Sequence, residues 1–219
     1  CAGTACTISD QLYGVPAGGT MAHSWVQMFD SQYEAFKTYC QIYPHNATLL
    51  VDTYNVLKSG VPDAIRAFDE VLKPLGIRKC GIRLDSGDMA YLTQEARRKL
   101  DAAGWTECQI SASNSLDEYL IQDLFMQGAQ IDMFGVGERM ITGKSDPVFG
   151  GVYKLAAIMD RHTGKFIPKI KLSENTEKVT NPGNKTIQRI YDKETGKIIA
   201  DLICLVDEEF DEKNSLLLF

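Results

Sequence analysis

The chain has 219 residues, of which 44% are hydrophobic and 24% are charged, a composition typical of a globular protein with an ordinary core. Its formal net charge of −6 argues against a nucleic-acid partner and against an anionic membrane surface, because both attract basic proteins. Within the given sequence no stretch has the pattern of a membrane span or of a signal peptide. An anionic small ligand stays compatible with this charge, because glycine loops and single arginines can bind it locally.

The six cysteines are scattered and form no Cys-x-x-Cys pair, which disfavours both a disulfide framework and a zinc site. Cys80 and Cys108 fall in expected strands, where free thiols behave as small apolar residues. We therefore expect a reducing, cytoplasmic location. The sequence begins at Cys1, and we expect it to be a piece of a longer protein.

The first 150 residues alternate short apolar runs with amphipathic segments, a pattern typical of βαβ units in a parallel sheet. Apolar residues recur at helical spacing over 61–75, 89–103 and 116–124, and Gly104 is placed to end the second of these helices. Ser115-x-x-Glu118 predicts a capping box for the third. The expected strands end near Asp52, Asp85, Ala112 and Gly135.

After residue 150 the pattern becomes β-rich. Strands are expected over 152–158, 166–172, 186–191 and 198–205, with a loop at 174–185 and a solvated acidic run at 207–212. Two similar Thr-Gly-Lys turns predict hairpins, because glycine supplies the positive φ that a tight turn needs. The fold class is therefore α/β, with a βα array over 1–150 and an appended β-rich segment over 151–219. The array is compatible with a barrel or with an open doubly wound sheet.

His23 is the first candidate for chemistry. It follows a Gly-Gly-Thr turn and precedes an expected helix, and an imidazole there can act as nucleophile or as general acid–base. The alternative is a structural histidine that caps the helix or is satisfied in a polar pocket. We interpret His45 and His162 as surface residues.

The segment from Arg83 to Asp88, Arg-Leu-Asp-Ser-Gly-Asp, is a sharper signal. Arg83 and Asp85 share one face of a strand end, and Gly87 permits close approach of a ligand to the backbone. The guanidinium can bind a carboxylate or phosphate, while Asp85 and Asp88 can accept from ribose hydroxyls or hold Mg²⁺ through water. Ser86, between them, is a further candidate for substrate binding. Alternatively, Asp88 only caps the helix that follows.

Further polar residues follow the next two strands. Ser113 and Asn114 offer short polar groups, and Gly135 and Gly137 can expose backbone N–H groups to a phosphate. A plain turn is the alternative for the two glycines. Lys169 and Lys171 could reach phosphates, although alternating lysines on a strand more often form its wet face.

Seven ordered blocks of this sequence resemble nicotinate phosphoribosyltransferase. They are Gly19-Thr20-Met-Ala-His23-Ser24, Leu50-Val-Asp52-Thr-Tyr54, Arg83-Leu-Asp-Ser-Gly-Asp88, Ser113-Asn114-Ser-Leu-Asp-Glu118, Gly135-Val-Gly137, Gly150-Gly-Val-Tyr-Lys154 and Lys171–Lys178 with Asn181-Pro-Gly183. The resemblance covers essentially the whole chain. So many blocks in order are far more specific than any one of them.

The resemblance implies an irregular α/β barrel of the type II phosphoribosyltransferases. It also implies synthesis of nicotinate mononucleotide and pyrophosphate from nicotinate and phosphoribosyl pyrophosphate in NAD salvage. ATP hydrolysis is coupled through a phosphohistidine that matches His23, and Mg²⁺ neutralises the departing pyrophosphate. Thr20 and Arg83 match contacts to the nicotinate carboxylate. Contacts to ribose and phosphate match Asp85, Ser113, Asn114, Gly135 and Gly137.

Two departures from the family pattern matter. Glu138 stands where many relatives carry threonine after the Gly-x-Gly, and a carboxylate cannot donate to a phosphate. The N-terminal domain of the family is also expected to be missing, and with it an aromatic residue for the pyridine ring. Since relatives form their sites between two subunits of a dimer, we expect this chain to be inactive by itself.

Three alternatives stay open. Nicotinamide phosphoribosyltransferase shares the fold and a comparable histidine, but Arg83 favours a substrate with a carboxylate. Quinolinate phosphoribosyltransferase is a weaker alternative because it lacks the histidine block. A non-catalytic phosphate-binding module on the same scaffold is the alternative from a different class.

Overall fold

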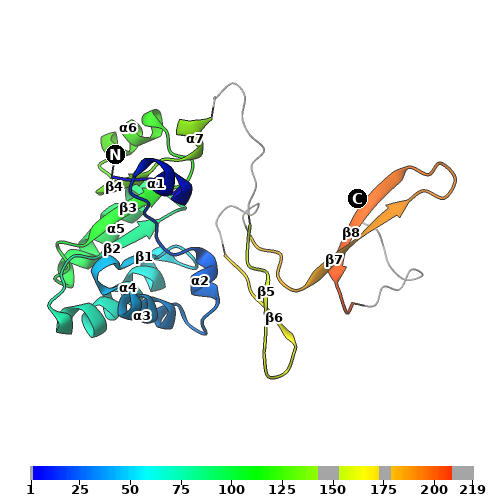
Figure 1. Cartoon of the computed structure of the whole chain (residues 1–219), viewed down its shortest axis with the longest axis horizontal. Helices are drawn as coiled ribbons and strands as arrows, with labels where there is room; N and C mark the ends of the chain where they lie inside the picture. The colour runs from blue at the N-terminus through cyan, green and yellow to red at the C-terminus, as the bar shows by residue number, and fades with distance from the viewer. Residues whose placement is uncertain (1, 143–152, 173–178, 209–219) are drawn as a thin grey trace. The chain divides into compact units, whose positions relative to one another are not determined.

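The computed structural model describes residues 2–142, 153–172 and 179–208. The chain divides into two compact units (Figure 1). Unit 1 comprises Cys1–Tyr153 and Lys171–Val179, and unit 2 comprises Lys154–Ile170 and Thr180–Phe219. Residues 171–179, which lie in the expected β-rich segment, thus group with unit 1.

Unit 1 contains a parallel sheet of four strands in the order β1-β2-β3-β4. The strands are β1 (Thr48–Leu50), β2 (Gly81–Leu84), β3 (Gln109–Ser113) and β4 (Met133–Gly135). Each pairs in parallel with its neighbour along the chain. The expected alternation of strands and helices is confirmed, so all four carboxyl ends lie at one edge of the sheet.

Helices connect these strands and precede them (Figure 1). Before β1 come α1 (Thr7–Tyr13), α2 (His23–Gln27), α3 (Gln32–Ile42) and the short turn η1 (Pro44–Asn46). Between β1 and β2, a helical run comprises η2 (Val56–Gly60), α4 (Val61–Ala67), η3 (Phe68–Leu72) and η4 (Lys73–Leu75). The later helices are α5 (Met89–Ala102), α6 (Glu118–Met126) and α7 (Glu138–Ile141).

The core of unit 1 lies around β1 and β2. Leu49 and Leu50 point to opposite faces of the sheet, and both are fully buried, so helices cover both faces there. Burying each such side chain contributes about 1.5–3 kcal/mol relative to leaving it exposed. Outside the strands, the fully buried aromatic side chains are Phe36, Phe68 and Trp105.

Burial decreases toward β4. None of the α6 residues is buried, and Phe125, Met126 and Met133 are all exposed. Within the described residues, β1 and β4 each pair with one neighbouring strand, so the sheet is open at both edges. The mixed α/β architecture is therefore confirmed, and closure into a barrel stays a prediction.

The starts of α5 and α6 can be compared with the boundaries that the sequence predicts. The α5 helix begins where expected: the Asp88 carboxylate accepts a hydrogen bond from the Tyr91 N–H at 3.1 Å, and Gly104 follows with φ +80°. The capping box at Ser115 is wrong. Ser115 adopts φ +54°, and Asp117 caps α6 by accepting from the Leu120 N–H at 2.9 Å. Two left-handed residues, Asn114 and Ser115, follow β3, and α6 therefore begins later than the sequence predicts.

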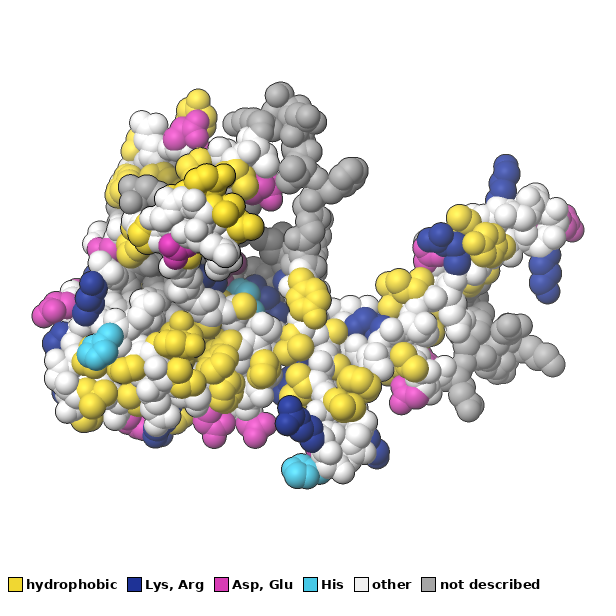
Figure 2. Space-filling view, in the orientation of Figure 1, with side chains coloured by type: hydrophobic (Ala, Val, Ile, Leu, Met, Phe, Trp, Pro, Cys, Tyr) yellow, Lys and Arg dark blue, Asp and Glu magenta, His cyan; other side chains and the backbone are white. Residues whose placement is uncertain are grey.

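Unit 2 contains two antiparallel hairpins. The first pairs β5 (Ala157–Met159) with β6 (Phe166–Pro168), and the second pairs β7 (Lys185–Tyr191) with β8 (Ile198–Leu205). Gly164 and Gly196 have positive φ in the two turns, as predicted. Figure 2 shows hydrophobic side chains at the surface of both hairpins. In the second hairpin, Ile187 and Ile203 are exposed.

Several boundaries in the β-rich segment differ from expectation. The strand expected over 166–172 ends at Pro168, because proline has no N–H to donate and disfavours continuation of the pairing. Lys171 is only 4% exposed, so its interpretation as part of a wet strand face is wrong. The strand expected from Val152 begins at Ala157, and residues 150–152 and most of the acidic run lie outside the described residues.

Among the residues that the structure describes, no helix is both long enough and apolar enough to cross a bilayer.

Candidate functional site

Polar side chains gather where β1, β2 and β3 end. Asp85 follows β2, and its carboxylate accepts a hydrogen bond from the Ser113 hydroxyl at the end of β3, at 2.5 Å. Asp52 follows β1 by two residues and accepts from the backbone N–H of Asp85 at 3.2 Å and from the Ser86 hydroxyl at 2.5 Å. Three successive strand ends are thus linked by hydrogen bonds into one polar cluster.

His23 joins this cluster from the start of α2. Its Nδ1 lies 3.1 Å from the Thr53 Oγ1, and its Nε2 lies 3.9 Å from the Asp85 Oδ2. Ala22, not His23, occupies the N-cap of α2, and it makes no side-chain capping bond. The capping alternative for His23 is therefore wrong. The His23 side chain is 20% exposed, so the imidazole is mostly buried among these groups.

Arg83 and Thr20 meet beside His23. The Arg83 Nη1 donates to the Thr20 Oγ1, and its Nη2 donates to the Met21 carbonyl at 3.1 Å. Among the described residues, the buried Nε has no hydrogen-bond partner. These contacts connect β2 to the turn that leads into α2, and they fix the plane of the guanidinium.

Asp52 is buried, with 4% of its surface exposed. Burial raises the pKa of the Asp52 carboxyl above its ordinary value, and the nearby Asp85 charge acts in the same direction. The hydrogen bond from Ser86 and the positive charge of Lys171 oppose this rise. Lys171 is itself buried, so its ammonium contributes a positive charge to the polar cluster at this edge.

The chain leaves β3 in an unusual conformation. Asn114 has φ +88° and Ser115 has φ +54°, values that non-glycine residues seldom adopt. Such backbone costs about 1–3 kcal/mol per residue and often occurs at ligand sites. Gly135 lies close by, since a Cβ added to it would approach the Ser113 Cβ to 3.2 Å. Backbone from β3 and β4 is therefore closely apposed here.

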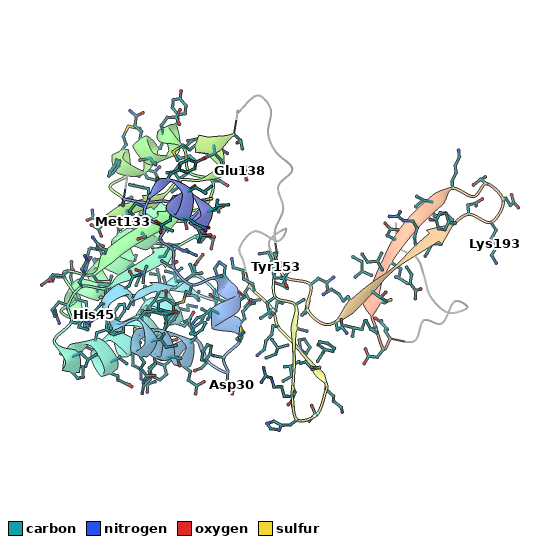
Figure 3. The ribbon with its side chains drawn as sticks, in the orientation of Figure 1. Asp30, His45, Met133, Glu138, Tyr153 and Lys193 are labelled. Carbon is teal, nitrogen blue, oxygen red and sulfur yellow. The ribbon has the colours of Figure 1, made fainter. Side chains whose placement is uncertain are left out.

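The remaining predicted site residues have other positions. Asp88 is the N-cap of α5, as expected if this residue caps the helix that follows β2. Gly87 in the same turn has φ +89°. Gly137 precedes α7, and no heavy atom lies within 4 Å of a Cβ added there. Glu138 is the first residue of α7 (Figure 3). The structure does not bring these residues into hydrogen-bonded contact with His23.

The other two histidines lie elsewhere. His45 belongs to η1, at the amino end of β1 and so at the opposite end of the sheet from Asp52 (Figure 3). His162 lies in the exposed turn between β5 and β6. Both positions agree with the interpretation of these histidines as surface residues.

Sequence reasoning did not single out two members of the cluster, Asp52 and Thr53, as site residues. Both follow a buried apolar run in the same way that Asp85 follows β2, so their position in the repeat could have identified them. For Lys171 the alternating lysines left two interpretations open, a phosphate contact or a wet strand face, and in the structure Lys171 is buried in unit 1.

These features define a class of protein: a parallel α/β protein with a cluster of polar side chains at the carboxyl edge of its sheet, the edge where open α/β folds generally bind ligands. The sequence comparisons identify the family. The chain is 44% identical over 209 residues to nicotinate phosphoribosyltransferase from Bacillus subtilis, covering 94% of this chain and 41% of that protein. It is 30% identical to the human nicotinate phosphoribosyltransferase, over 92% of this chain and 46% of that one. The chain thus belongs to the nicotinate phosphoribosyltransferase family and spans less than half the length of these relatives.

Solved structures support the same fold. The crystal structure of human nicotinic acid phosphoribosyltransferase matches 96% of this chain and 47% of its own, with a TM-score of 0.56 and 24% identity. The Porphyromonas gingivalis nicotinate phosphoribosyltransferase matches 78% of this chain with a TM-score of 0.58 and 22% identity. A scan against protein-family models finds no match.

Proposed function

We propose that this chain supplies part of the active site of a nicotinate phosphoribosyltransferase. The reaction converts nicotinate, phosphoribosyl pyrophosphate and ATP to nicotinate mononucleotide, pyrophosphate, ADP and phosphate in NAD salvage. One observation carries the proposal: His23 lies 3.9 Å from Asp85, and Arg83, Thr20 and Ser113 are linked to the same strand ends.

Arg83 would bind the nicotinate carboxylate. A guanidinium has five N–H donors, of which the contacts to Thr20 and Met21 use two, and its plane is already fixed. A carboxylate could then form charge-assisted hydrogen bonds with the remaining donors. Thr20 would position the guanidinium and contact the same carboxylate.

His23 would couple ATP hydrolysis to the reaction. A ring nitrogen attacks the γ-phosphorus of ATP, the new N–P bond forms as the bond to the ADP oxygen breaks, and water later hydrolyses the phosphohistidine. The nucleophile would be the ring nitrogen that carries the lone pair of the neutral imidazole. The Asp85 carboxylate next to the ring stabilises the positive charge that develops on it.

The glycosyl transfer itself needs little covalent chemistry from the protein. The nicotinate nitrogen attacks the anomeric carbon of the ribose as the bond to pyrophosphate breaks, through an oxocarbenium-like state that carboxylates stabilise. Asp85, Ser113 and Asn114 would bind the ribose. Ser86 and Gly87 lie in the same β2 turn, and Gly135 and Gly137 would offer backbone N–H groups to phosphate.

Mg²⁺ is expected to accompany the substrates, and the residues present fit it only in part. Asp52 and Asp85 place two carboxylates near each other, and among the described residues the Asp52 Oδ1 has no hydrogen-bond partner. The described residues contain no group of three side chains suited to hold a metal ion. We therefore propose that the substrate diphosphate would supply most of the ligands of Mg²⁺, which would neutralise the negative charge of the departing pyrophosphate.

The four-stranded sheet and its polar cluster would be only part of the complete fold and active site. The open sheet edges at β1 and β4 suit continuation into an irregular barrel, and the matched relatives are more than twice as long as this chain. We propose that the rest of the site comes from additional sequence and from a second subunit of a homodimer. The five free cysteines of the described residues fit a cytoplasmic location.

Replacing His23 tests the proposal in a protein that joins this chain to the remaining portion of its relatives. His23→Ala is expected to abolish the coupling of ATP hydrolysis to nicotinate mononucleotide synthesis, and His45→Ala to leave both rates unchanged. Unchanged ATP hydrolysis and coupling in His23→Ala would instead favour a non-catalytic phosphate-binding module. The 219-residue chain alone is expected to show no turnover, and measurable turnover would contradict the proposed incomplete site.

A further inference from the structure

The two ring nitrogens of His23 face different partners. Nδ1 lies 3.1 Å from the Oγ1 of Thr53, and Nε2 lies 3.9 Å from the Oδ2 of Asp85. A neutral imidazole carries its proton on one nitrogen and a lone pair on the other. The neighbours of the two nitrogens therefore decide which tautomer is present.

Asp85 favours the proton on Nε2. This nitrogen is buried, and at 3.9 Å the carboxylate is too far for a short hydrogen bond but close enough for strong electrostatic interaction. A carboxylate attracts an N–H dipole and repels a nitrogen lone pair. The Ser113 hydroxyl donates to the other oxygen of Asp85, which keeps the carboxylate in place.

Thr53 favours the same tautomer from the opposite side. A threonine hydroxyl can donate or accept, so with the proton on Nε2 it donates to the Nδ1 lone pair. Thr53 is fully buried directly after Asp52, and its β-branched side chain has few rotamers. The hydroxyl is therefore held at a fixed place against the ring.

We propose that Thr53 is a positioning residue that, together with Asp85, holds His23 as the Nε2–H tautomer with its lone pair on Nδ1. The meaning of this tautomer for catalysis rests on the proposed function, since it decides which nitrogen is available as a nucleophile. The tautomer itself does not depend on that function. It can therefore be measured without substrate and without turnover.

Nitrogen-15 NMR of the 219-residue chain tests the proposal. The sequence has only three histidines, so the His23 ring signals can be assigned by their loss in His23→Gln. At a pH where the ring is neutral, couplings between the ring nitrogens and ring C–H protons identify the protonated nitrogen. The wild type is expected to show protonated Nε2 as the main form.

Two variants and one conservative control sharpen this test. Thr53→Val keeps the shape and removes the hydroxyl, and it is expected to change the tautomer ratio roughly fivefold toward Nδ1–H, the effect of one net hydrogen bond. Asp85→Asn is expected to shift the ratio in the same direction. Thr53→Ser restores the hydroxyl and is expected to restore the wild-type ratio.

Specific results would overturn the proposal. A wild-type ring with its proton mainly on Nδ1 would contradict it, as would an unchanged ratio in folded Thr53→Val. If Thr53→Val does not fold, Asp85→Asn and Thr53→Ser decide the question. A wild-type ratio in Asp85→Asn, or a shifted ratio in Thr53→Ser, would then refute it. Failure of the proposed enzymatic activity would leave these signals unaffected, so the two ideas can fail separately.

Discussion

Arg83 and Thr20, 63 residues apart in the sequence, are joined by a hydrogen bond from the guanidinium to the threonine hydroxyl. The same guanidinium donates to the carbonyl of Met21. One side chain from β2 thus holds the turn that presents His23. This contact couples the position of the imidazole to the position of the expected carboxylate-binding group.

Thr20→Val should loosen this connection. The substitution removes the acceptor of a charge-assisted hydrogen bond and leaves the part-buried guanidinium with one partner fewer, so we expect a loss of about 1–3 kcal/mol in the free energy of unfolding. Urea unfolding measures this loss. Thr106→Val, at an exposed turn, is the matched control and should change stability by less than about 0.5 kcal/mol. Equal effects of the two substitutions would contradict the importance of the Arg83–Thr20 contact.

Asp52 should make stability depend on pH in an uncommon direction. Burial raises the pKa of its carboxyl in the folded state, so the folded protein binds a proton more tightly than the unfolded chain does. Its contribution to stability is therefore lost as pH rises from the ordinary aspartate pKa through the raised one. Asp52→Asn removes this dependence and should gain stability relative to wild type as pH rises.

Chemical unfolding of wild type and Asp52→Asn at several pH values checks this sign. The stability difference, variant minus wild type, should become more favourable to the variant between acidic and neutral pH. A difference that is constant with pH, or that moves the other way, would show that the carboxyl is not perturbed as described.

Glu70 should show the opposite behaviour. Lys37 donates to its carboxylate, as do Tyr33 and Arg66, and together these contacts lower the pKa of Glu70 to about 2. Its stabilising contribution is fully present above the unfolded-state pKa and is lost as pH falls from that value through the folded-state pKa of about 2. Glu70→Gln should therefore lose less stability than wild type on acidification below about pH 5. Parallel acid-stability curves for the two proteins would disprove this assignment.

Gly60 sits where the helical run after β1 crosses close to the strand. A Cβ added to Gly60 would come within 2.0 Å of the Val51 carbonyl oxygen, so Gly60→Ala forces backbone to move. Overpacking of this kind costs about 1–3 kcal/mol or more. Gly18→Ala, with no heavy atom within 4 Å of the added Cβ, is the control. Thermal unfolding should separate the two variants, and similar melting temperatures would contradict the close approach.

Much of the secondary structure and strand order of unit 1 can be predicted from the local pattern of apolar and polar residues. The strands are short segments with buried apolar residues at β1, β2 and β3, and the longer helices between them show helical periodicity, so the parallel order could be predicted without knowledge of tertiary contacts. Asp85 and Ser113 were placed at one edge by this repeat alone. The start of α6 was missed because the left-handed backbone at Asn114 and Ser115 has no glycine to signal it.

The positions of Thr53 and Lys171 in the polar cluster depend on contacts between residues that are distant in the sequence. Thr53 is an unremarkable residue in sequence, and only its position opposite His23, 30 residues away, gives it a role. Lys171 belongs to an alternating pattern that usually marks a wet strand, yet burial in unit 1 removes it from solvent. Neither composition nor period encodes these tertiary contacts.

Chemical-shift mapping of the 219-residue chain tests most directly whether these strand ends form one substrate site. Phosphoribosyl pyrophosphate with Mg²⁺ is added to the isotope-labelled chain, and backbone amide shifts are followed. The largest changes are expected at residues 20–23, 52–54, 83–88, 113–115 and 135–137. Changes centred on the turn at His162 or on the β7–β8 hairpin, or no change at millimolar ligand, would contradict the account.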